Sequence, residues 1–332
     1  MRLIQQIQLP DGRSTTNLGL GCAGILRIPT MRGREKLLRT AVDEGLTHFD
    51  VARMYGLGQA EGILGKILMP VRDQVTVGTK FGLPYVNMAG GSTRIQSIGR
   101  WLFNMSPGLK RMIRKATARR APSTPQAFTP NHYSVDEMEK SLDLSLQNLQ
   151  RNRVDLFYLH EPGMHDVIDE NLGQVLAQKQ ASGKIGVFGL SGHRREVEHY
   201  LKTRPDVCGS AIQYSYSPLK KGEEGQPLQF PFTGMFSVIE GSLQPLLHLL
   251  SERKQFTRTW SEKLGLELGR RENVGIVILA MALALNPGGL VLFFTSNPKR
   301  LQQTIRRMAD NQFSQENLLA FREAVTGGIH AN

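Results

Sequence analysis

Residues 134–160 read SVDEMEKSLDLSLQNLQRNRVDLFYLH, a helical pattern that leads directly into a strand pattern. Ser134, with Glu137 three residues later, is the signature of a capping box at the start of a helix. The apolar residues that follow recur at helical spacing, at Val135, Met138, Leu142 and Leu146. Residues 154–160 then form an apolar run with the length of a strand. A helix that leads into such a strand predicts parallel strands joined by helical crossovers.

The same alternation of strand and helix patterns extends along the chain in both directions. Residues 32–44 and 59–68 have helical patterns, and the first of them ends before Gly45, a typical C-terminal stop. Strand patterns occur at residues 18–21, 47–50, 75–80, 154–160, 185–190, 211–216, 233–239 and 291–294. The seventh of these is the least regular, because residues 220–231 before it read as a loop where a helix is expected. Eight strands alternating with helices predict an α/β fold, the (β/α)8 TIM barrel, and residues 1–332 are predicted to form one domain.

The formal charge of +12 is concentrated in one part of the chain. Between Asp73 and Asp136 the sequence has no acidic residue and nine basic ones. The basic residues are Lys80, Arg94, Arg100, Lys110, Arg111, Arg114, Lys115, Arg119 and Arg120. The sequence of residues 84–132 does not require a helix or a strand, although residues 95–103 and 109–118 would suit short basic amphipathic helices. We predict a long basic insertion after the third strand, which overhangs the C-terminal mouth of the barrel and attracts an anionic substrate. The alternative interpretation is a solvated loop without a role at the site.

The composition argues against several other classes of protein. The sequence has no apolar run of about 18 residues that would cross a membrane, and its first residues lack the apolar core of a signal peptide. Cys22 and Cys208 give no disulfide framework, and His132 and His165 lack the spacing of metal ligands, so we assign no metal. The overall charge pattern is not that of a nucleic-acid-binding protein. A reduced, cytoplasmic setting is the resulting expectation.

Four polar residues stand at or near the C-terminal ends of predicted strands, where the reactive groups of parallel barrels lie. They are Asp50, Tyr55, Lys80 and His160. Taken singly they have structural explanations: Asp50 as a helix cap, Lys80 as a solvated loop residue and His160 as a core histidine. Together they suit general acid chemistry, because an ammonium lowers the pKa of a nearby phenol and a histidine can polarise a substrate oxygen.

Five segments resemble motifs of the aldo-keto reductase family. They are FDVARMYG at 49–56, EGILG at 61–65, VGTK at 77–80, VDLFYLHEP at 154–162 and GKIGVFGLS at 183–191. The resemblance extends from Gly19 to Met308, apart from the insertion and residues 220–260. It implies a TIM-barrel oxidoreductase that interconverts a carbonyl (an aldehyde, ketone or sugar) and an alcohol by hydride transfer with NADPH.

The resemblance assigns roles to the four strand-end residues. Tyr55 would be the general acid that protonates the carbonyl oxygen. Lys80 and Asp50 would tune the pKa of that phenol, and His160 would position the carbonyl. The substrate would be a small carbonyl compound or a sugar, of anionic character if the basic insertion attracts it.

The cofactor contacts implied by the resemblance also follow predicted strands. Ser191 and Gln213 would bind the carboxamide of the nicotinamide, and Tyr216 would stack on its ring. Arg300 would hold the 2′-phosphate, since a guanidinium grips phosphate bidentately, so NADPH is favoured over NADH. The remaining contacts are Gly21, Cys22, Asp50, Thr295, Ser296, Lys299, Gln303 and Thr304. Cys22 has a simpler interpretation as a small buried residue.

Three positions depart from the family pattern. Gly192 stands where an asparagine usually follows the serine, Phe294 where a small or basic residue is common, and Thr304 where an asparagine usually reads the adenine. These departures support a second hypothesis, a nicotinamide-binding regulatory barrel without turnover. A third hypothesis is contact with a membrane surface through residues 94–120, which mix basic and apolar residues as interfacial helices do.

Overall fold

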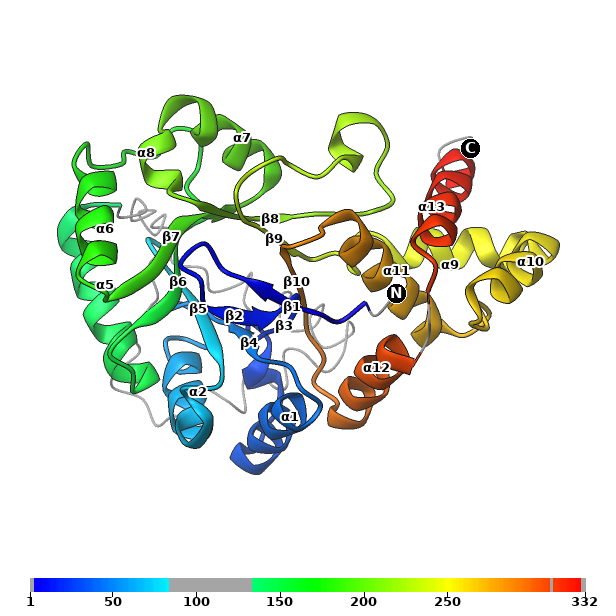
Figure 1. The fold of residues 1–332 in the computed structure, drawn as a ribbon, viewed down its shortest axis with the longest axis horizontal. Coiled ribbons are helices and arrows are strands. Elements are labelled where there is room, and N and C mark those ends of the chain that lie inside the picture. The colour runs from blue at the N-terminus through cyan, green and yellow to red at the C-terminus, as the bar shows by residue number, and fades with distance from the viewer. Residues whose placement is uncertain (1–2, 84–132, 311–312, 330–332) are drawn as a thin grey trace, which may run out of the picture.

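Eight parallel strands close into a barrel in the computed structural model of the chain, which describes residues 3–83, 133–310 and 313–329 (Figure 1). Around the barrel the strands follow one another in chain order, and the last strand pairs with the first. They are β3 (Leu18–Gly21), β4 (His48–Asp50), β5 (Thr76–Phe81), β6 (Val154–His160), β7 (Ile185–Gly192), β8 (Ala211–Ser215), β9 (Thr233–Phe236) and β10 (Leu290–Phe293). The predicted (β/α)8 barrel is therefore confirmed, including its seventh strand, and strand ends differ from the prediction by a few residues at most.

Helices surround the strands on the outside of the barrel (Figure 1). They are α1 (Met31–Asp43), α2 (Ala60–Leu68), α5 (Val135–Leu149), α6 (Leu172–Ala181), α7 (Arg194–Thr203), α8 (Pro205–Cys208), α9 (Leu243–Glu252), α10 (Lys254–Leu264), α11 (Arg271–Leu285), α12 (Pro298–Asp310) and α13 (Gln315–Ile329). Nearly all of α11 is buried, because it packs against β10 and also contacts α9, α12 and α13. Within the described ranges, no helix has the combination of length and apolar character that a membrane crossing needs.

Two helix ends show how the sequence sets the element boundaries. Ser134 caps α5, because its hydroxyl accepts a hydrogen bond from Glu137 N at 3.2 Å. The Glu137 carboxylate accepts from the Ser141 hydroxyl at 3.1 Å, so the structure shows the serine half of the expected capping box. Gly45 follows α1 with φ of +86°, the left-handed conformation that commonly ends a helix.

A short hairpin of β1 (Gln6–Gln8) and β2 (Ser14–Thr16) covers the N-terminal ends of the barrel strands. Thr15 Oγ1 lies 2.7 Å from Thr76 Oγ1 at the start of β5. Arg13, in the same hairpin, donates to the carbonyl of Val75 at 3.2 Å. The hairpin is therefore bonded to the barrel through the residues that begin β5.

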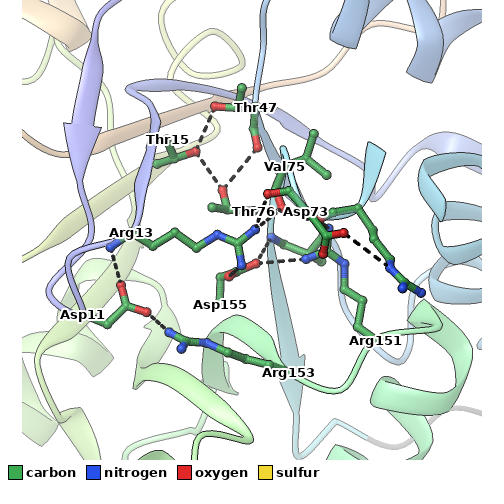
Figure 2. A network of polar contacts seen from close by, with 12 residues as sticks. Asp11, Arg13, Thr15, Thr47, Asp73, Val75, Thr76, Arg151, Arg153 and Asp155 are labelled. Atoms are coloured by element: carbon green, nitrogen blue, oxygen red, sulfur yellow. Dashed lines mark hydrogen bonds and ion pairs between the residues drawn. The ribbon is translucent and has the colours of Figure 1, made fainter. Parts of the chain in front are cut away.

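A buried ion-pair network beside the hairpin is centred on Asp155, near the start of β6 (Figure 2). The Asp155 carboxylate pairs with Arg13 at 2.8 Å and with Arg151 at 3.3 Å, and it accepts from Val77 N at 2.7 Å. Burial raises the pKa of Asp155, although the two arginines and the Val77 N–H lower it. The network joins the hairpin, β5 and β6 at the end of the barrel opposite the expected site.

The two irregular regions of the sequence differ in what the structure describes. The basic insertion, residues 84–132, lies outside the described residues, as do the helices and the membrane-contact segment predicted within it. Residues 220–231 form a loop, as predicted, with a short 3-10 turn at Gly222–Gly225. Arg322 Nη2 donates to the last carbonyl of that turn at 2.6 Å, so α13 holds the loop in place.

Candidate active site

The four predicted strand-end residues converge at the C-terminal mouth of the barrel. Asp50 and His160 end β4 and β6. Lys80 lies near the end of β5, and Tyr55 lies in the loop between β4 and α2. All four line one cavity of about 390 Å³. The Tyr55 and His160 rings meet edge-on with 5.7 Å between their centroids, and Lys80 Nζ lies 5.4 Å from the centre of the Tyr55 ring.

A buried ion pair adjoins this cavity. Lys80 Nζ lies 2.5 Å from Asp50 Oδ1 and also donates to the Val51 carbonyl at 3.0 Å. The other oxygen, Asp50 Oδ2, accepts from Gln213 Nε2 at 2.8 Å, and Gln213 Oε1 accepts from Ser191 Oγ at 2.7 Å. One chain of hydrogen bonds therefore connects Ser191 and Gln213, the residues predicted to bind the nicotinamide carboxamide, to the Asp50–Lys80 pair.

The surroundings of Tyr55 raise its pKa above the usual value for tyrosine. The main cause is burial, and the negative charges of Asp50 and Glu161 add to it. Lys80, which was predicted to lower this pKa, is paired with Asp50 at 2.5 Å and is not among the main causes of the shift, so its effect on Tyr55 stays a prediction. Tyr55 is consequently held in its protonated form, which a proton donor requires.

His160 is buried and uncharged at neutral pH. Burial lowers its pKa well below the usual value, and the positive charge of Lys80 lowers it further. Its backbone carbonyl accepts from the Tyr133 hydroxyl at 2.7 Å, which fixes the end of β6. A neutral imidazole has one N–H donor, so His160 can donate a hydrogen bond to a substrate oxygen without adding charge.

A second cavity, of about 620 Å³, lies at the N-terminus of α12. Six of the predicted cofactor residues line it: Thr295, Ser296, Lys299, Arg300, Gln303 and Thr304. Arg27 and Arg271 line it as well, and Glu272 is the one acidic residue among the described lining residues. Four basic side chains at a helix N-terminus suit the binding of a phosphate group.

The two cavities share a wall. Both are lined by Arg27, Ile239, Phe293 and Phe294. Phe294, one of the departures from the family pattern, packs directly on Gly24, where an added Cβ would come too close to its ring. The missing side chain at Gly24 thus makes room for the aromatic ring that separates the cavities.

Two predicted cofactor contacts, Tyr216 and Cys22, line neither of these two cavities. The Tyr216 hydroxyl donates to the Gly225 carbonyl at 2.8 Å, and its ring lines a neighbouring cavity. The aromatic residue that lines the catalytic cavity from the end of β9 is Phe236. Cys22 is fully buried, with its thiol 3.5 Å from a backbone carbonyl, whereas the preceding Gly21 lines the cavity.

Several residues that line the cavity were not predicted as site residues, among them Phe236, Glu161, Arg27 and Glu240. Phe236 carried a signal, since it ends a strand and strand ends hold the functional residues of this fold. Glu161 follows His160 and reads as an ordinary loop carboxylate, and Arg27 belongs to no motif. Backbone strain does mark the region: Glu161 and Ser237 have φ of +51° and +57°, uncommon for non-glycine residues and frequent at functional sites.

The closed parallel barrel and the polar groups at its mouth define a TIM-barrel oxidoreductase. A sequence profile described as the Aldo/keto reductase family matches residues 17–325, and the chain belongs to this family. It is accordingly an oxidoreductase. The predicted family resemblance is confirmed.

Curated relatives match this chain over part of their length. Pyridoxal 4-dehydrogenase from Microbacterium luteolum is 27% identical over 245 residues, which are 69% of this chain and 68% of that protein. The aldo-keto reductase yakc from Schizosaccharomyces pombe, whose name specifies NADP(+), is 26% identical over 60% of this chain and 49% of its own.

Solved structures share the fold over nearly the whole chain. Glycerol dehydrogenase from Gluconobacter oxydans has a TM-score of 0.67 at 16% identity and covers 98% of this chain and 96% of its own. An aldo-keto reductase from Klebsiella pneumoniae, solved in complex with NADPH, has a TM-score of 0.60 at 18% identity and covers 97% and 95%. At these identities the likeness shows the fold.

Proposed function

We propose that the chain reduces a carbonyl group of a small molecule with NADPH and that Tyr55 is the proton donor. The observation that carries this proposal is the convergence of Tyr55, His160 and the Asp50–Lys80 pair on one cavity of about 390 Å³. A cavity of this size suits a small-molecule substrate. The names of the relatives, which are reductases and dehydrogenases, are consistent with the proposal.

Tyr55 and His160 would hold the substrate oxygen between them. Tyr55 keeps its proton because burial raises its pKa, and neutral His160 donates a hydrogen bond to the same oxygen. As hydride reaches the carbonyl carbon, the Tyr55 proton passes to the oxygen and the alcohol forms. The centre of the phenolate ring left behind lies 5.4 Å from Lys80 Nζ. The phenolate then takes a proton from solvent.

The residues of the two cavities fit NADPH, which supplies the hydride when it is bound. Ser191 and Gln213 present a hydroxyl and an amide for its carboxamide, and we assign the stacking role predicted for Tyr216 to Phe236. The basic cavity at the N-terminus of α12 would hold the 2′-phosphate. The NADPH complex of the Klebsiella pneumoniae protein and the NADP(+) in the name of the yeast relative support this choice.

Arg300→Gln should weaken the binding of NADPH by about tenfold to a hundredfold, the value of a charge-assisted hydrogen bond to phosphate. The affinity for NADH should change little, because NADH lacks the 2′-phosphate. Dissociation constants from fluorescence titration test this. Arg306→Gln is the matched control, since Arg306 lies on the same helix and pairs with Glu44 at 2.7 Å. Equal losses for NADPH and NADH would contradict the assignment.

The rate of carbonyl reduction should be nearly independent of pH between roughly pH 6.5 and pH 9. Tyr55 must be protonated to act as the acid, and its raised pKa keeps it so throughout this range. His160 must be neutral, and its lowered pKa keeps it so above the ordinary histidine range. The measurement is kcat/KM for a series of small aldehydes and ketones, read from the absorbance of NADPH. A rate that falls as pH rises through the neutral range would show that a protonated histidine is needed.

The same assay separates this proposal from a regulatory barrel that binds a nicotinamide without turnover. Tight binding of NADPH, with no oxidation by any carbonyl compound in the series, would favour the regulatory function. Turnover that depends on Tyr55 would favour the reductase.

A further inference from the structure

Glu161 brings a carboxylate to the catalytic cavity that the proposed reaction does not use. It follows His160 at the end of β6, is half-buried, and lines the cavity with Tyr55 and His160. Its negative charge acts on Tyr55, where it contributes to the raised pKa after burial and Asp50. The carboxylate therefore adjoins the space where the reacting oxygen would lie.

The backbone of Glu161 is held in an unusual conformation. Its φ of +51° lies in the left-handed region, which residues other than glycine rarely adopt. Its N–H donates to the Ser191 carbonyl at 2.6 Å, and the carbonyl of the preceding His160 accepts from Tyr133 at 2.7 Å. The peptide is thus fixed by neighbours on both β7 and the segment before α5, so the side chain is kept at the cavity wall.

Among the described residues, none compensates the charge of Glu161 by a direct contact. Within the described part of the chain, no side chain donates a hydrogen bond to its carboxylate or forms an ion pair with it. Lys80 is already paired with Asp50 at 2.5 Å. Arg27 is exposed on the wall shared with the second cavity, where the proposed phosphates would lie.

Gly192 lies directly beside Glu161. A Cβ added at Gly192 would stand 3.6 Å from the Glu161 Cα. An asparagine, which the family usually has here, would place an amide group next to this carboxylate. Glycine offers neither a hydrogen-bond partner nor side-chain volume, so the carboxylate stays available to a ligand.

We propose that Glu161 is a specificity-determining residue that selects carbonyl substrates with a positive charge or a hydrogen-bond donor near the reacting carbon and disfavours carboxylates. The inference rests on the proposed carbonyl reduction. A charge in a partly enclosed cavity interacts more strongly than in bulk water, because the effective dielectric is lower. The basic insertion was expected to attract anionic substrates, which is the opposite preference. The charge of the preferred substrate therefore distinguishes selection by Glu161 from selection by the insertion.

Three para-substituted benzaldehydes test the proposal: the trimethylammoniomethyl, neopentyl and carboxymethyl compounds, in which a methylene group insulates the ring and its carbonyl from the charge. The first two have the same shape and differ in charge. The value of kcat/KM is measured with NADPH for the wild type, Glu161→Gln and Glu170→Gln. Glu170 is the control, because it is an exposed carboxylate in the same β6–α6 connection and lines none of the cavities described above.

We expect the wild type to prefer the cation over its neutral isostere by about tenfold and the isostere over the carboxylate. Glu161→Gln should remove most of this preference, read as the ratio of kcat/KM for the cation to that for its neutral isostere, whereas Glu170→Gln should retain the wild-type ratio. A wild-type preference for the carboxylate, or an unchanged ratio in Glu161→Gln, would overturn the proposal. So would a change confined to the affinity for NADPH, which would assign Glu161 to the carboxamide of the cofactor.

Failure of the proposed function gives a different result. If none of the aldehydes is reduced, we compare instead the dissociation constants of the three corresponding benzyl alcohols from the complex of the protein with NADP+. If the wild type prefers the cationic alcohol and Glu161→Gln removes this preference, Glu161 selects ligands by charge even though the aldehydes are not reduced. Equal binding of the three alcohols would overturn it.

Discussion

Tyr55→Phe is expected to reduce kcat by about 10²-fold to 10⁴-fold, the usual contribution of a general acid. The substitution removes the hydroxyl alone, so the ring can keep its edge-on contact with His160 at 5.7 Å and its position 5.4 Å from Lys80 Nζ. The loss would arise because hydride transfer would leave an alkoxide with no proton donor beside it. Single-turnover oxidation of NADPH with saturating aldehyde measures the chemical step.

Binding of NADPH should be unchanged in Tyr55→Phe, because the proposed phosphate and carboxamide contacts come from other residues. Tyr200→Phe is the control: its hydroxyl donates to the Gly163 carbonyl at 2.6 Å, away from the catalytic cavity. We expect that variant to keep the wild-type kcat. A similarly small change in Tyr55→Phe would mean that His160, the other donor at the cavity, protonates the product.

The barrel could be predicted because each strand carried its own local signal. The apolar run VDLFYLH became β6, and the weakest segment still forms β9 at Thr233–Phe236, because the loop before it replaces a helix without disturbing the strand order. Of the described helices, only α1, α2 and α5 were predicted, and the outer helices α9 and α13 are among those that were not. A local pattern shows that a helix has an apolar side, but not that it packs on α11 instead of on the strands.

The motifs predicted which polar residues meet but not how their surroundings affect them. The pKa of Tyr55 depends on burial and on the nearby negative charges of Asp50 and Glu161, and spacing in the sequence encodes neither. Tyr216 follows β8 and Phe236 ends the neighbouring β9. A shift of one residue at either strand end would turn that side chain to the other side of the strand, and the sequence does not fix strand ends that closely. Glu161 is placed by a positive φ that no residue pattern indicates.

Asp155→Ala is expected to lower the free energy of unfolding by about 3 to 5 kcal/mol, the usual cost of breaking a buried ion pair. The Asp155 carboxylate is fully buried, pairs with Arg13 at 2.8 Å and Arg151 at 3.3 Å, and accepts from Val77 N at 2.7 Å. Alanine would remove the partner of all three groups (Figure 2). Urea unfolding followed by circular dichroism measures the change.

Asp155→Asn should cost less than alanine, because the amide oxygen can still accept a hydrogen bond from one of these groups and the neutral side chain avoids the burial penalty that raises the pKa of Asp155. Glu35→Gln is the control for an exposed pair: it lies 2.9 Å from Arg39 on α1 and should change stability by no more than about 0.5 kcal/mol. The folded Asn variant should keep its kcat, since the network lies at the opposite end of the barrel from Tyr55. If Asp155→Ala were no more destabilising than the control, solvent would be satisfying the arginines and the hairpin network would not stabilise the base of the barrel.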